Sequence, residues 1–168
     1  MPALDGMIAA LLALEEEHRG IVKSGRTHLQ DATPIAFSQE ISGWRASLER
    51  DRAAIAAGLD GLRPLAIGGT AVGTGLNAPK GFGEAVAAEL TTLLATSFTS
   101  DENKFSALTS LAPFATAHAA LKALAADLFK MANDIRLMAS GPRCGLYEIT
   151  IPENEPGSSI MPGKVNPT

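Results

Sequence analysis

The strongest constraint on the fold is a seam of apolar residues that runs through positions 114–138 without a break. Its members alternate at spacings of three and four, the heptad pattern of a helix that packs against other helices. They are Phe114, Ala117, Leu121, Leu124, Leu128, Met131, Ile135 and Met138. Alanines fill much of the remaining surface, so neighbouring helices can approach closely. The pattern predicts a long helix over much of 104–139, buried on several sides, which Pro113 either kinks or divides into a short and a long helix.

Three further segments show helical periodicity: residues 3–23, 38–59 and 82–95. Ser38 is the expected N-cap of the second segment. Thr99 begins a sequence with capping-box spacing, which places the start of the long helix just after it.

Two segments interrupt the helices. Residues 25–34 are densely polar and end in a proline, which predicts a loop between helices in which Gly25 stops the first helix. Residues 58–83 hold eight of the sixteen glycines, which predicts a long irregular connection. The predicted class is therefore all-α, at least two-thirds helix with no sheet of consequence. Residues 1–168 are expected to form a single partial domain, a central helical bundle with long irregular loops.

Composition supports a helical bundle and excludes several classes of partner. The chain is 46% apolar but only 5% aromatic, and it carries a net charge of −4 without a basic stripe, which argues against nucleic acid. No apolar run reaches about 18 residues, so no membrane span is expected. Residues 1–20 lack the basic region of a signal peptide. One cysteine, Cys144, fits a reducing compartment, and no histidine or cysteine cluster predicts a metal site.

Polar chemistry is concentrated in residues 157–166, which read Gly-Ser-Ser-Ile-Met-Pro-Gly-Lys-Val-Asn. The segment has neither helical nor strand periodicity, yet it carries the hydroxyls of Ser158 and Ser159, the ammonium of Lys164 and the carboxamide of Asn166. Backbone N–H groups in such a glycine-rich turn can surround a developing oxyanion. Composition alone fits an ordinary polar surface loop equally well.

The order of these residues is more specific than their composition. Gly-Ser-Ser-x-Met-Pro-x-Lys-x-Asn resembles the signature of the fumarase/aspartase superfamily, whose members eliminate water, ammonia or amines to leave fumarate. Residues 25–32, Gly-Arg-Thr-His-Leu-Gln-Asp-Ala, resemble a second motif of that superfamily. Residues 69–77 resemble a third, Gly-Thr-Ala-x-Gly-Thr-Gly-Leu-Asn; they lack the Gly-Lys-Ser/Thr ending of a nucleotide-binding loop.

The flanking residues resemble class II fumarases more than aspartases. The similarity lies in residues 103–105, 140–145 and 151–156, and in Gly163, where aspartases typically carry alanine. Family members are considerably longer, and this chain looks like their middle third. The resemblance therefore implies a fragment that lacks the N-terminal substrate-binding segment and the acidic residue that orients the active-site histidine.

The resemblance implies reversible anti-elimination of water from (S)-malate to give fumarate, a step of the tricarboxylic acid cycle, without a metal or organic cofactor. It implies that Ser158 removes the proton and that His28 acts on the leaving hydroxyl, directly or through water. The residues that it implies at the substrate carboxylates are Thr27, Ser159, Lys164 and Asn166.

The resemblance also implies a cytoplasmic homotetramer whose core is built from the central helices of four subunits and whose active sites combine loops from three chains. The 168-residue chain is then expected to self-associate and to be inactive alone, with residues 155–168 mobile.

Two alternatives stay open. The first is an aspartate ammonia-lyase of the same superfamily, which aspartate would reveal by release of ammonia. The second is a non-catalytic helical oligomerisation module, which the heptad seam alone would support.

Overall fold

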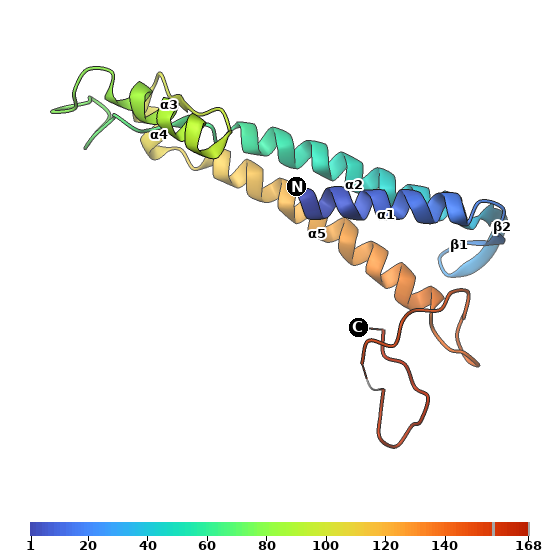
Figure 1. Cartoon of the computed structure of the whole chain (residues 1–168). Helices are drawn as coiled ribbons and strands as arrows, with labels where there is room; N and C mark the ends of the chain where they lie inside the picture. The colour runs from blue at the N-terminus through green and yellow to red at the C-terminus, as the bar shows by residue number, and fades with distance from the viewer. Residues whose placement is uncertain (156, 168) are drawn as a thin grey trace. The chain divides into compact units, whose positions relative to one another are not determined.

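The computed structural model of the protein describes residues 1–155 and 157–167. It consists of two compact units, Met1–Leu124 and Ala125–Thr168. The elements, in chain order, are α1 (Pro2–Glu17), β1 (Val22–Thr27), β2 (Gln30–Ala36), α2 (Phe37–Asp60), β3 (Pro64–Leu65), α3 (Phe82–Leu94), β4 (Thr99–Ser100), α4 (Lys104–Thr109) and α5 (Ala112–Met138) (Figure 1).

The helical class is confirmed, although helices make up about half of the chain and not the predicted two-thirds. In the described part of the chain the strands form two small sheets of two strands each, β1 with β2 and β3 with β4. The predicted helix content was too high because residues 22–36 form a hairpin and the chain after α5 is irregular. That residues 1–168 form one partial domain stays a prediction. No helix in residues 1–155 and 157–167 is long and apolar enough to cross a membrane.

Helices α1 and α2 lie side by side and form the core of the first unit (Figure 1). The buried apolar side chains of this pair are Leu11 of α1 and Ile41, Trp44, Leu48 and Ile55 of α2, and Asp51 of α2 is buried with them. Their spacings on α2 place them on one face, as the sequence pattern predicts. Arg45 Nε of α2 lies 2.8 Å from Glu15 Oε2 of α1. Hydrogen bonds to Glu15 and Glu49 raise the pKa of Arg45.

The predicted extension of the first helix to residue 23 is wrong. α1 ends at Glu17, and Gly20 then takes a φ of +146°, which residues with a side chain rarely adopt. The β-branched residues Ile21 and Val22 follow and lead into a strand. Gly25, predicted to stop the helix, lies instead within β1.

Small residues allow α2 to approach α5 closely within the first unit. A Cβ atom on Gly58 would lie 3.0 Å from the Cα of Ala117. The seam on α5 is nevertheless covered unevenly, because Phe114 and Leu121 are 65% and 52% exposed. Met138, at the end of the seam, is 3% exposed. Burial of the whole seam is therefore not found among the described residues.

The long helix expected over 104–139 is divided, which is one of the two outcomes expected of Pro113. α4 ends at Thr109, and α5 begins at Ala112 with Pro113 as its second residue. Proline is tolerated there because N–H groups in the first turn have no partner within the helix.

The predicted helix start after Thr99 is wrong. Thr99 and Ser100 form β4, which pairs in parallel with β3. The cap of α4 is Asn103, whose side-chain oxygen accepts from the N–H of Ser106 at 3.0 Å. The irregular connection over residues 58–83 is confirmed for the stretch between α2 and α3, and it contains β3.

Candidate functional site

A β-hairpin occupies the polar segment that was expected to be a loop between helices. β1 and β2 pair antiparallel from Val22↔Ala36 to Thr27↔Gln30, so that His28 and Leu29 alone form the turn. Both turn residues have positive φ, 51° and 62°, as in a type I′ hairpin turn. The sequence does not predict this hairpin, because turns of this type usually contain Asn-Gly or Asp-Gly. Here the turn residues are His-Leu.

Gly25 lies where the register of this hairpin shifts. Ser24 pairs with Pro34 and Arg26 with Asp31, so the register slips across Gly25. A Cβ atom on Gly25 would lie 2.7 Å from the carbonyl oxygen of Thr33 on β2, closer than van der Waals contact. Glycine is therefore required here by the close approach of β2, and not by the end of a helix.

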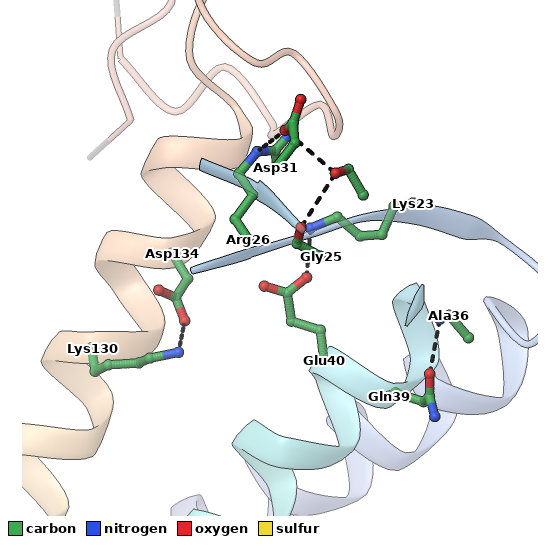
Figure 2. Close-up of polar contacts among 10 residues, drawn as sticks. Lys23, Gly25, Arg26, Asp31, Ala36, Gln39, Glu40, Lys130 and Asp134 are labelled. Atoms are coloured by element: carbon green, nitrogen blue, oxygen red, sulfur yellow. Dashed lines mark hydrogen bonds and ion pairs between the residues drawn. The ribbon is translucent and has the colours of Figure 1, made fainter. Parts of the chain in front are cut away.

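Side chains from both strands brace the hairpin (Figure 2). Arg26 Nε lies 3.4 Å from Asp31 Oδ1, across the pair of strands. The hydroxyl of Ser24 donates to the same carboxylate oxygen at 3.3 Å. Arg26 and Asp31 of the resembled motif thus contribute to the shape of the hairpin.

The hairpin is also fastened to the start of α2. Lys23 Nζ of β1 lies 2.7 Å from Glu40 Oε2 of α2, as Figure 2 shows. Sequence reasoning missed this pair because its members are seventeen residues apart and only the hairpin brings them together. Ala36 is the N-cap of α2, and its N–H donates to Gln39 Oε1 at 2.9 Å, so Ser38 is not the cap.

The first two candidate residues therefore lie at an exposed tip. Thr27 is the last residue of β1 and His28 is the first residue of the turn, and both are exposed. The structure brings these two together because they are neighbours at the end of a braced hairpin. Exposure leaves their side chains accessible to a ligand.

The segment of residues 157–166 belongs to the second unit and closes on itself. At the neck of this loop residue 157 closely approaches residue 164. A Cβ atom on Gly157 would overlap the carbonyl group of Lys164. Asn166 Nδ2 donates to the carbonyl oxygen of Gly157 at 3.3 Å. At the far side the N–H of Lys164 donates to the carbonyl oxygen of Met161 at 3.2 Å, after Gly163 with a φ of +78°.

This closure gathers four of the candidate residues on one loop. Ser158 and Asn166 are half-buried near the neck, whereas Ser159 and Lys164 are exposed. The N–H of Ile160 donates to Ser158 Oγ at 3.3 Å. That hydroxyl oxygen therefore receives a hydrogen bond from the backbone of its own loop.

The six candidate residues thus fall into two groups, Thr27 with His28 in the first unit and the other four in the second. The predicted mobile segment 155–168 includes Pro156 and Thr168, which lie outside the described residues. Within the described residues, no three histidine, cysteine, aspartate or glutamate side chains are grouped so that they could hold a metal ion.

Comparison with known proteins gives a consistent result along the whole chain. The lyase family model matches residues 1–168. The chain is 60% identical over 168 residues to a class II fumarate hydratase of Bacillus subtilis and 59% identical to that of Campylobacter jejuni. In both cases the match covers all of this chain and 36% of the relative, so the chain spans about a third of the length of these curated relatives.

A solved structure agrees in fold as well as in sequence. The class II fumarase of Schistosoma mansoni superposes with a TM-score of 0.96 at 41% identity, over 99% of this chain and 38% of that protein.

Proposed function

Because the chain belongs to the lyase family, whose model it matches over residues 1–168, we propose that the full-length protein is a class II fumarate hydratase. It interconverts fumarate and (S)-malate by anti addition and elimination of water. The observation that carries the proposal is the 60% identity to a class II fumarate hydratase along the entire chain. Residues 157–166, which the sequence singles out as a site for a small anion, support it independently.

The demanding step is removal of a proton from the carbon next to a carboxylate. The resulting carbanion is held as a doubly charged aci-carboxylate, so preorganised donors and cations around that carboxylate supply most of the catalytic effect. We assign proton removal to Ser158. A serine hydroxyl is a poor base unless its ionised form is stabilised. The hydrogen bond from the N–H of Ile160 to Ser158 Oγ supports this role, because a donor to the oxygen favours the alkoxide.

Substrate binding is assigned to the side chains that can donate hydrogen bonds to carboxylates. Lys164 supplies a positive charge, and Asn166 and Ser159 supply neutral donors on the same loop. Thr27 adds a hydroxyl beside His28, which exchanges a proton with the leaving hydroxyl, directly or through water. Every step is assigned to these side chains, and the proposal needs no metal or organic cofactor.

The proposed assembly is a cytoplasmic homotetramer in which each active site combines loops from more than one subunit. The apolar side chains that α5 exposes, among them Phe114 at 65% exposure, support association with further subunits. The 168 residues alone are accordingly proposed to lack turnover.

The test is to incubate the purified full-length protein with malate and to follow the ultraviolet absorbance of fumarate, with Ser158→Ala as the control. Turnover that disappears in Ser158→Ala supports both the reaction and the assignment of the base. Release of ammonia from aspartate, without turnover of malate, would instead identify an aspartate ammonia-lyase. A full-length protein inactive on both substrates would favour the non-catalytic helical module.

A further inference from the structure

The hairpin that carries Thr27 and His28 needs support from outside itself. In the described part of the chain β1 pairs only with β2, and an isolated two-stranded hairpin is marginally stable at best in water. Its turn places two residues with side chains, His28 and Leu29, at positive φ. Such a backbone persists only where the surrounding structure holds it.

Within residues 1–155 and 157–167, a backbone hydrogen bond attaches the hairpin at its base. The N–H of Phe37 donates to the carbonyl oxygen of Ile21 at 2.8 Å, and β2 runs directly into α2 at the junction of Ala36 and Phe37. This attachment holds the base of the hairpin, so a second attachment nearer the tip helps to fix the direction in which the tip points.

The ion pair between Lys23 and Glu40 supplies that second attachment (Figure 2). The two side chains are 12% and 24% exposed, so water and salt screen the pair less than an ion pair on the open surface. Glu40 lies in the first turn of α2, where the helix dipole favours a negative charge. Lys23 lies four residues before Thr27 on the strand that leads to the tip. The pair therefore joins that strand to a long helix.

We propose that Lys23 and Glu40 are positioning residues for His28 and Thr27. Their ion pair holds the hairpin on the start of α2 and so sets where the turn presents its side chains to the substrate. Neither residue needs to touch the substrate. The inference rests on the proposed function, and it extends the site to two residues that the motif of residues 25–32 does not contain.

The first test measures kinetics on the full-length protein. Lys23→Met and Glu40→Gln should each lower kcat about 10- to 100-fold, the range expected when a catalytic group is displaced by about 1 Å. KM should change less, because the groups that bind the carboxylates on the other loop are intact. The double variant should be no slower than the slower single variant, since both single variants remove the same ion pair. Lys23→Arg keeps the charge and should retain most of the turnover.

A matched ion pair controls for a general loss of stability. Glu15 and Arg45 join α1 to α2, and their side chains are 19% and 22% exposed, close to the values for Lys23 and Glu40. Glu15→Gln and Arg45→Met should lower Tm by a similar amount and leave kcat unchanged. Equal losses of kcat in the control variants would overturn the proposal. So would a loss in Lys23→Met without one in Glu40→Gln, which would show that the ion pair is not what positions the tip.

A second measurement does not depend on the reaction. Hydrogen exchange of the amides of residues 22–36 should become faster in Lys23→Met and Glu40→Gln than in wild type, and should not change in Glu15→Gln. Unchanged exchange in the first two variants would overturn the proposal. If the wild-type protein fails to convert malate, the proposed function fails, and the exchange experiment still decides whether the pair anchors the hairpin.

Discussion

The substitution Gly25→Ala adds one methyl group to the hairpin. It should open the hairpin and lower the turnover of malate. The new Cβ would lie 2.7 Å from the carbonyl oxygen of Thr33 and 3.2 Å from Cγ2 of Ile35, both on β2. Relief requires the two strands to separate by several tenths of an ångström, next to the pairing of Arg26 with Asp31. Overpacking of this kind costs about 1–3 kcal/mol. A two-stranded hairpin is only marginally stable, so a cost of this size is enough to open it.

The assay combines hydrogen exchange of residues 22–36 with turnover of malate by the full-length protein. Gly25→Ala should exchange faster in this segment and lose at least about tenfold in kcat, because His28 is no longer held in place. The control is Gly43→Ala, on the exposed face of α2 with no heavy atom within 4 Å of the new Cβ. It should stabilise the helix by about 0.5–1 kcal/mol and leave turnover unchanged. Wild-type exchange and turnover in Gly25→Ala would refute the reasoning.

Three further substitutions and one property of the chain can be tested. Ser158→Ala should lower kcat by about 10²–10⁴-fold at unchanged Tm, because it removes one hydroxyl from a loop; near-normal turnover would show that another group is the base. Lys164→Ala should raise KM for malate and lower kcat, by about tenfold or more in kcat/KM, and an unchanged KM would contradict its role at a carboxylate. Gly58→Ala should lower the free energy of unfolding by about 1–2 kcal/mol despite better helix propensity, because the new Cβ meets the backbone of Ala117; a rise in Tm would contradict this. The 168-residue chain should self-associate in sedimentation experiments, since α5 leaves Phe114 65% exposed beside further apolar side chains, and a monomer at high concentration would contradict this.

The helices could be predicted because their signal is local and repeated. Ile41, Trp44 and Leu48 recur on one face of α2, and each proves to be buried. The division between α4 and α5 was one of the two outcomes expected of Pro113, because proline disrupts a helix interior and is tolerated in the first turn. The exact start of α4 was not foreseeable, since both Thr99 and Asn103 have the chemistry of a cap. The pairing of Thr99 and Ser100 with β3 decides between them, and that contact is distant in sequence.

The hairpin could not be predicted from local signals. Its strands carry Arg26, Gln30 and Asp31, and its turn is His-Leu, so neither alternation of apolar residues nor a glycine turn indicates it. The cross-strand bond from Arg26 to Asp31 and the attachment of Lys23 to Glu40 supply what the turn sequence lacks. These contacts exist only after the fold has formed, and therefore the site geometry is harder to predict than the identity of the site residues.

The loop of residues 157–166 shows how structure changes the interpretation of a sequence motif. From the sequence, Gly157 matters for its flexibility. In the structure it matters for the space that it leaves, because any side chain there would overlap the carbonyl group of Lys164. That closure brings Asn166 within hydrogen-bonding distance of the Gly157 carbonyl oxygen and so places its carboxamide near Ser158, eight residues earlier. The steric demand at Gly157 therefore accounts for the closed shape of the loop, and its role in binding an anion stays a prediction.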